Sequence, residues 1–370
     1  MAQPITIGIV GGGRVGAGFA RFIKTQEEAR LVGFQTTTAA RQQELTQLFG
    51  MPSYGTVQEL MRQQKPQVVC VVNANADHAP ATITALKMGA HVFCEKPMAP
   101  TMAECRAMVQ AEKESGRALQ IGFEYMHGTM TARLRELVQQ GFFGRVTWAS
   151  FLDSRGHWWS DSPSVALSSI WKLDRKKGGG IVFHCGIHQL DMIRCYLGPI
   201  ESVTAYRPPV NALSFYPADV PDNVTLMLKA RSGAVCNFQI FHNRAPCYYR
   251  QTSPWQPDWR QVPGHDFDVS LVGTAGSCEM KIYKEKLYLF RFDIEHRDTT
   301  LERIEDFAHH PANASHHDMN ALLLAFVRNI AAGRGAIDAS TDAMETMSLA
   351  FAAEAAIERP GEVVKVGRES

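Results

Sequence analysis

Residues 8–16 read GIVGGGRVG, and this stretch decides the fold that the sequence predicts for the first part of the chain. The mostly apolar residues 5–10 predict a strand that ends directly before Gly11. The glycines at 11–16 then open a helical run, and the strand-like residues 30–34 follow it. A lone G-x-G-x-x-G pattern is a weak signal. Between a strand and a helix, however, the glycines let the backbone approach a pyrophosphate, and the helix N-terminus attracts its negative charge. The stretch therefore predicts a βαβ unit that binds a dinucleotide.

Strands and helices continue to alternate after this unit, which is typical of a doubly wound parallel sheet. Further strands are expected at 67–72, 91–94 and 119–123, with helices near 77–88 and 101–115. From Gly144 onward most segments have strand character, and they are expected at 145–152, 201–206, 223–229, 234–241, 268–272, 277–283 and 286–292. Helices near 316–332 and 341–357 complete the chain. The sequence predicts an α/β Rossmann domain at 1–124 and an α+β domain with a large, mainly antiparallel sheet at 125–370.

Composition limits the classes of function. The 370 residues carry a net charge of +1 and are 45% hydrophobic, so neither nucleic acid nor a membrane is an expected partner. The N-terminal residues lack the basic and apolar regions of a secretion signal. The eight cysteines include no C-x-x-C pair, which favours buried thiols over a disulfide framework. A cytoplasmic protein is expected.

Four further motifs share an order and spacing with a known family. They are HVFCEKP at 91–97, GFFGRV at 141–146, GGGIVFHCGIHQLD at 178–191 and VSLVGTAGS at 269–277. With these motifs the chain resembles the glucose-fructose oxidoreductase, inositol dehydrogenase and MocA family (Gfo/Idh/MocA). The resemblance implies a nicotinamide-dependent enzyme acting on sugars, polyols or related cyclic compounds. It also implies an open-faced sheet in the second domain that serves for oligomerisation, as a homodimer or homotetramer.

The resemblance implies that Lys96, in the segment Glu95-Lys96-Pro97, is the catalytic lysine. An ammonium between cofactor and substrate can hold and polarise a hydroxyl. The alternative is an ordinary charged turn, in which Pro97 pushes Lys96 toward an extended conformation.

His184 and His188 stand four residues apart, and Asp191 follows. The family pattern places an aspartate where this chain has His184, whereas His188 and Asp191 match it. We expect His188 to be the general acid–base. His184 is expected to relay the proton, bind a substrate hydroxyl or coordinate a metal. A zinc site would need a third ligand, for which Glu124, His127 and His157 are candidates, and no metal is the favoured prediction. The doublets 309–310 and 316–317 are expected to be solvated or capping histidines.

The second strand of a dinucleotide-binding unit usually ends in an acidic residue that reads the ribose 2′-hydroxyl. Here Thr36 takes that position, and with Thr37 and Arg41 it favours NADP over NAD, since an aspartate would repel a 2′-phosphate. A neutral loop that accepts either cofactor is the alternative. The residues expected to bind the cofactor are Gly11, Gly13, Arg14, Val15, Gly16, Thr36, Thr37, Arg41, Asn73, Asn75, His78, Glu95 and Lys96.

Aromatic residues cluster at 158–159 and 247–261, where they could stack on a sugar or form a subunit interface. The residues expected near the substrate are Tyr125, Arg155, Trp171 and Asp191. The chain is predicted to transfer hydride between a nicotinamide and a hydroxyl-bearing carbon of a sugar, cyclic polyol or sugar derivative. The alternatives are a redox-assisted glycoside hydrolase or lyase without net cofactor turnover, and a dinucleotide-binding regulator without catalysis.

Overall fold

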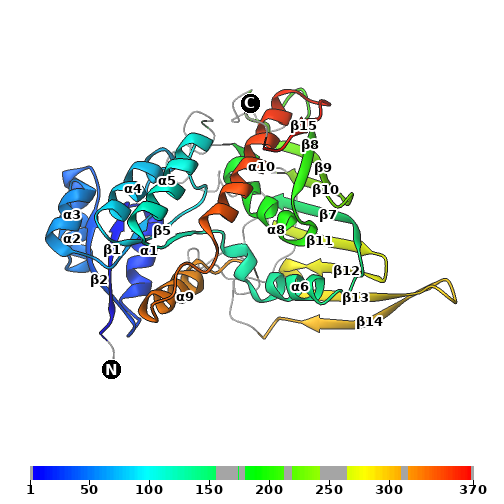
Figure 1. Ribbon diagram of the computed structural model, residues 1–370, viewed down its shortest axis with the longest axis horizontal. Helices are drawn as coiled ribbons and strands as arrows, with labels where there is room; N and C mark the ends of the chain where they lie inside the picture. Colours follow the sequence, from blue (N-terminus) through cyan, green and yellow to red (C-terminus); the bar gives the residue numbers. More distant parts are fainter. Residues whose placement is uncertain are drawn as a thin grey trace. The chain divides into compact units, whose positions relative to one another are not determined.

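The computed structural model describes residues 3–155, 174, 180–211, 219–241, 265–309 and 316–367, which form two units (Figure 1). The first unit comprises Met1–Phe123 and Met319–Met347, and the second comprises Glu124–Asp318 and Ser348–Ser370. Several predicted sites lie outside the described residues. These are His157, Trp158, Trp159, Trp171, His310 and the segment 247–261.

The first unit is built on a six-stranded parallel sheet, as predicted. Its strand order is β3-β2-β1-β4-β5-β6. The strands are β1 (Ile5–Val10), β2 (Ala29–Gln35), β3 (Ser53–Tyr54), β4 (Val68–Val71), β5 (His91–Cys94) and β6 (Leu119–Ile121). The helices are α1 (Arg14–Ile23), α2 (Ala39–Phe49), α3 (Val57–Gln64), α4 (His78–Lys87), α5 (Met102–Ser115) and α9 (Met319–Ala331), with the 3₁₀ turn η1 (Asn75–Asp77). The central strands are almost entirely buried, which is typical of a parallel sheet covered on both faces.

Helix α9 departs from the predicted domain division. Four apolar residues on one face of α9 are buried in the core of the first unit, and Phe326 lies 6.2 Å from Phe93 of β5, measured between ring centroids. The second domain is therefore not the continuous segment 125–370 that the sequence suggested. The apolar periodicity of α9 was visible in the sequence, but not which core would bury it.

The second unit contains a nine-stranded, mainly antiparallel sheet, as predicted. Its order is β14-β13-β12-β11-β7-β10-β9-β8-β15, and β7 and β10 pair in parallel. The strands are β7 (Val146–Arg155), β8 (Ile200–Tyr206), β9 (Asn223–Ala230), β10 (Val235–Phe241), β11 (His265–Gly273), β12 (Gly276–Lys281), β13 (Lys286–Asp293), β14 (Asp298–Asp306) and β15 (Val364–Lys365). The helical elements are η2 (Glu124–His127), α6 (Thr129–Gln139), the π-helix η5 (Ile181–Gly186), α8 (Ile187–Leu197) and η7 (Ile282–Lys284); α10 (Ser340–Glu358) contains the division between the units.

Alternate residues of β9, β10, β12 and β13 are buried, so one face of the sheet carries the core. On β10 the buried residues are Cys236, Phe238 and Ile240. Helix α8 packs on this face, where the ring of Tyr196 lies 6.3 Å from that of Phe151 on β7. The sheet thus supports the helix that carries His188, one of the two predicted catalytic histidines.

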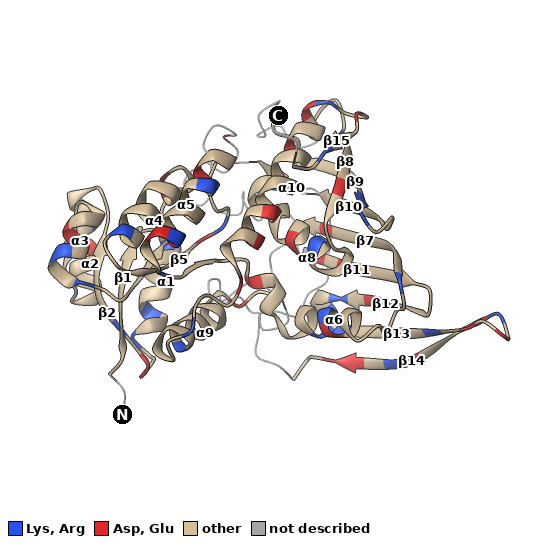
Figure 2. Ribbon diagram, viewed as in Figure 1, with Lys and Arg blue, Asp and Glu red and all other residues tan. Residues whose placement is uncertain are grey.

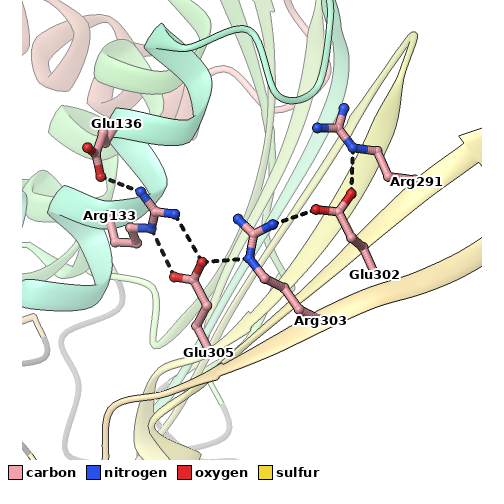
Figure 3. Close-up of polar contacts among 6 residues, drawn as sticks. All are labelled: Arg133, Glu136, Arg291, Glu302, Arg303 and Glu305. Atoms are coloured by element: carbon pink, nitrogen blue, oxygen red, sulfur yellow. Dashed lines mark hydrogen bonds and ion pairs between the residues drawn. The ribbon is translucent and has the colours of Figure 1, made fainter.

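A chain of ion pairs joins helix α6 to the edge strand β14 (Figure 3). Arg133 reaches both carboxylate oxygens of Glu305, at 2.9 and 3.1 Å, and this two-pronged contact is the favoured geometry for an arginine–carboxylate pair. The chain continues through Arg303, Glu302 and Arg291. It fixes α6, which directly follows the segment Glu124–His127.

Basic and acidic residues are interspersed along both units (Figure 2). None of the helices in the described ranges combines the length and the apolarity that crossing a bilayer requires. The cysteines that the structure describes form no disulfide, and Cys195 alone among them is exposed. Burial raises the pKa of Cys105 and of Cys278 to about 12, so these thiols stay protonated and inert.

Candidate functional site

The glycine-rich turn follows β1 and opens helix α1, as predicted. Gly11 adopts a φ of 113°, which a residue with a side chain rarely tolerates. A Cβ on Gly16 would lie 2.0 Å from the carbonyl oxygen of Gly11, whereas a Cβ on Gly13 would meet nothing within 4 Å. The turn therefore has open space at Gly13, beside the N-terminus of α1, and this combination fits a pyrophosphate.

Thr36 follows the end of β2, close to the glycine-rich turn. Arg41 on α2 donates its Nε–H to the carbonyl oxygen of Gly12 at 2.6 Å and pairs with Glu44. A Cβ on Gly12 would contact both Arg41 and Thr36, which shows how closely these residues gather. The structure thus brings together the threonine and the arginine that the sequence proposed as readers of the ribose.

His78 links the loops that follow β4 and β5. It is fully buried, and its Nδ1 lies 2.8 Å from the carbonyl oxygen of Pro97. A carbonyl only accepts, so Nδ1 carries the proton. Burial lowers the pKa of His78, against the opposing effect of this hydrogen bond. The neutral imidazole therefore holds the Glu95-Lys96-Pro97 segment in place, a role that the sequence did not suggest.

Lys96 lies directly after β5, half-buried, and its backbone N–H donates to the carboxylate of the buried Glu95 at 3.1 Å. In the sheet register Val10 pairs with Val71, and Val71 pairs with Cys94. The glycine-rich turn and Lys96 therefore follow aligned strand ends at the carboxyl edge of one sheet. Ligands of doubly wound folds bind at that edge, where the strand order reverses between β1 and β4.

The predicted histidine helix begins irregularly. His184 lies in the π-helix η5, and His188 lies in the first turn of α8, so the segment is not one regular α-helix. Glu354 of α10 accepts a hydrogen bond from the backbone N–H of Phe183 at 3.0 Å. Gly180 begins the segment with a φ of 127°, and a Cβ there would lie 3.1 Å from the same carboxylate. A carboxylate from a distant helix thus caps the start of the histidine segment.

His188 is buried within a cluster from three parts of the second unit. Tyr125 stacks on its ring with centroids 4.1 Å apart and an interplanar angle of 9°. Its Nδ1 lies 3.7 Å from Oε2 of Glu124, and the other oxygen of Glu124 lies 2.8 Å from Nδ1 of His317. His316 is buried edge-on against Tyr125.

The sequence predicted 316–317 to be a solvated or capping doublet; His316 is instead buried, whereas His317 is exposed and its Nδ1 lies 2.8 Å from Glu124. The sequence named Glu124 only as a candidate third metal ligand, and it missed the contacts of Glu124 with His188 and His317. The only sequence evidence for these contacts was a carboxylate and two histidines in segments nearly two hundred residues apart, and no local pattern connects such segments.

The remaining predicted residues have mixed outcomes. Asp191 is buried on α8, 4.0 Å from Arg194. Tyr125 stacks on His188, and its place near the substrate stays a prediction. Arg155 ends β7, and its side chain lies outside the described part, as does Trp171. Within the described ranges, no group of three or more His, Cys, Asp or Glu side chains is arranged to hold a metal ion. The roles of Lys96 and His188 stay predictions.

Comparison with known proteins decides the family. Residues 5–123 match the oxidoreductase family with an NAD-binding Rossmann fold, and residues 131–279 match the Gfo/Idh/MocA C-terminal domain. The chain belongs to the Gfo/Idh/MocA family. This family member is 30% identical to D-glucoside 3-dehydrogenase of Escherichia coli over 55% of the chain and 58% of that enzyme. It is 25% identical to myo-inositol 2-dehydrogenase of Thermotoga maritima over 86% of the chain and 94% of that enzyme.

The fold agrees with that of a solved dehydrogenase structure. The complex of levoglucosan dehydrogenase with NADH and levoglucosan superposes with a TM-score of 0.78 at 20% identity, covering 99% of this chain and 100% of that chain. At this identity the likeness shows the shared fold. The chain spans about half the length of several curated relatives that it matches, the Escherichia coli enzyme among them.

Proposed function

We propose that this family member is an NAD(P)-dependent oxidoreductase that transfers hydride between a nicotinamide and a hydroxyl-bearing carbon of a sugar, cyclic polyol or sugar derivative. The observation that carries the proposal is the carboxyl edge of the first sheet. There the glycine-rich turn, open at Gly13, and the half-buried Lys96 follow aligned strands. A dinucleotide whose pyrophosphate lies at Gly13 would extend along the edge that carries Lys96.

In the proposed reaction His188 and Lys96 have different roles. In the oxidation direction the substrate hydroxyl gives its proton to His188, and the carbon gives hydride to the nicotinamide, which supplies the electron acceptor when bound. Lys96 donates a hydrogen bond to the same oxygen and stabilises its developing negative charge. The named activities of the relatives, on glucosides and inositol, support this substrate class.

The cofactor is proposed to be NADP. Thr36 stands where an acidic residue usually ends the second strand, and Arg41, which also pairs with Glu44, holds its guanidinium beside the glycine-rich turn. A cationic side chain next to hydroxyls suits a 2′-phosphate better than the acidic residue that usually selects NAD.

The experiment is a panel of cyclic polyols, sugars and aryl glycosides assayed with both nicotinamides. Substrate-dependent reduction of the cofactor supports the oxidoreductase, whereas release of the aglycone without net reduction supports the redox-assisted hydrolase. A protein that binds the dinucleotide and converts none of the panel supports the regulator.

The catalytic lysine is tested by Lys96→Ala, with Lys87→Ala on the exposed surface of α4 as the matched control. Lys96→Ala should retain cofactor binding and thermal stability but lose at least about a hundredfold in kcat, the usual scale for a positioned proton-transfer or electrostatic group. Turnover equal to that of Lys87→Ala contradicts the assignment.

The open face of the second sheet is proposed as a homo-oligomer interface. Large apolar side chains are partly exposed on this face: Trp148 of β7 is 39% exposed and Met227 of β9 is 38% exposed. Covering such a face by a second copy would remove this apolar surface from water. Light scattering on the purified protein tests it, and a strict monomer contradicts it.

A further inference from the structure

We propose that Glu124 and His317 form a positioning pair that orients His188 and sets its charge. The inference rests on the proposed function, in which His188 is the proton acceptor. Glu124 lies between the two imidazoles, with one carboxylate oxygen 3.7 Å from Nδ1 of His188 and the other 2.8 Å from Nδ1 of His317.

The arrangement selects one tautomer of His188. An ionised carboxylate can only accept, so it attracts a ring N–H and repels a ring lone pair. Nδ1 of His188 faces Glu124 and therefore carries the proton. The lone pair is left on Nε2, at the other side of the ring, where it can accept a proton from a substrate hydroxyl. A carboxylate that orients an imidazole in this way is a common device for making histidine a base.

Burial explains why two imidazoles meet one carboxylate. The side chain of Glu124 is 0% exposed, and an ionised carboxylate removed from water is costly unless polar partners surround it. His188 is 5% exposed, whereas His317 is 44% exposed. His317 is thus the solvent-facing partner that offsets part of the negative charge of Glu124. The part of that charge that is not offset acts on His188.

The pair also accounts for the departure of this chain from its family pattern. Position 184 holds an imidazole where the pattern has an aspartate. Glu124 supplies a carboxylate to His188 from η2 instead. Negative charge next to the base is therefore retained, although it comes from a different element of the fold.

Tyr125 completes the arrangement by fixing the plane of the ring. It stacks on His188 at 4.1 Å, and its carbonyl oxygen accepts a hydrogen bond from the Thr131 hydroxyl of α6. Among the described residues, further titratable groups lie next to these side chains or on the same segment: His316 beside Tyr125, Tyr283 against His316, and His184 and Asp191 on the histidine segment. Asp153 accepts a hydrogen bond from Gln189, the chain neighbour of His188.

The first experiment compares two substitutions with opposite expected effects. Glu124→Gln removes the negative charge, so a protonated His188 is less favoured, and the acid limb of the kcat/KM profile should move to lower pH. kcat should fall at least about tenfold with little change in KM, because orientation of the base is lost. Glu124→Asp, which keeps the charge, should recover part of the rate.

His317→Ala removes the partner that offsets the carboxylate. His188 then faces more negative charge, and the acid limb should move to higher pH. The matched controls are Asp293→Asn and His296→Ala, from an exposed Asp–His pair at the end of β13 whose Nδ1 and Oδ2 lie 2.7 Å apart, and they should leave the profile unchanged. If Glu124→Gln and His317→Ala move the limb in the same direction, or not at all, the proposal is wrong.

A second measurement needs no substrate. In ¹⁵N-histidine NMR of the full chain, with His188→Gln assigning the resonance, His188 should show the proton on Nδ1. A proton on Nε2 alone would overturn the inference even in an active enzyme. Failure of the proposed function looks different, because the wild-type protein would then reduce no nicotinamide with any member of the panel while the Nδ1–H tautomer persists.

Discussion

Replacing Gly16 with alanine tests whether the glycine-rich turn is built by close backbone packing. The new Cβ would lie 2.0 Å from the carbonyl oxygen of Gly11 and 3.3 Å from Cγ2 of Ile9. Gly11 cannot retreat easily, because its N–H donates to the carbonyl oxygen of Gln35 at 2.9 Å and a Cβ on it would already crowd the backbone after β4. The clash is therefore with main chain in the turn directly after the central strand β1.

The expected loss in the free energy of unfolding of Gly16→Ala is the difference between two opposing effects. Overpacking against backbone costs about 3 kcal/mol, the upper end of the usual range, because no flexible side chain can give way. Alanine in helix α1 recovers about 1 kcal/mol of helix propensity. The net loss is about 2 kcal/mol, which lowers the midpoint of thermal unfolding by about 4–8 °C for a unit of this size.

Gly13→Ala is the matched control in the same turn. Its Cβ would meet nothing within 4 Å, and Gly13 has the extended φ of −73° that alanine accepts. Its unfolding midpoint should stay within about 3 °C of wild type, while its affinity for the dinucleotide falls, because the methyl group occupies the space left for the pyrophosphate. Calorimetry and fluorescence titration measure the two effects. Equal midpoints for Gly16→Ala and Gly13→Ala would refute the packing argument.

Three further predictions concern charge. Thr36→Asp should weaken NADPH binding by at least about tenfold and spare NADH, since a carboxylate repels the 2′-phosphate; unchanged NADPH affinity in a fluorescence titration would show that this loop is not the reader. His184→Asp should keep measurable activity but move the pH optimum for oxidation upward, because a carboxylate on the same segment favours protonated His188; an unshifted profile rejects the coupling. His78 has a pKa lowered by burial from 6.5, so the unfolded chain binds the extra proton and stability should fall as pH drops below about 6.5, by up to about 1.4 kcal/mol per pH unit. Denaturant unfolding should show a smaller acid loss in His78→Asn, and an equal loss would assign it to other groups.

The sequence by itself determined the parts of this protein that depend on neighbouring residues. The glycine-rich turn between a strand and a helix predicted the βαβ unit, because backbone conformation and close approach are local properties of Gly11 and Gly16. Alternating strands and helices predicted the parallel sheet, and later strand-rich segments predicted the second sheet, since the period of apolar residues is set within each element.

Only the tertiary structure decided which distant residues meet. Helix α9 has an apolar face in either domain assignment, but packing against Phe93 places it in the first unit. His317 reads in sequence as one of two solvated histidines, yet Glu124 meets it and His188 from segments far apart along the chain. The physical reason is the same in both cases. A local sequence pattern predicts whether a side chain is buried or charged, but the packing of whole helices and strands determines which distant residue it contacts.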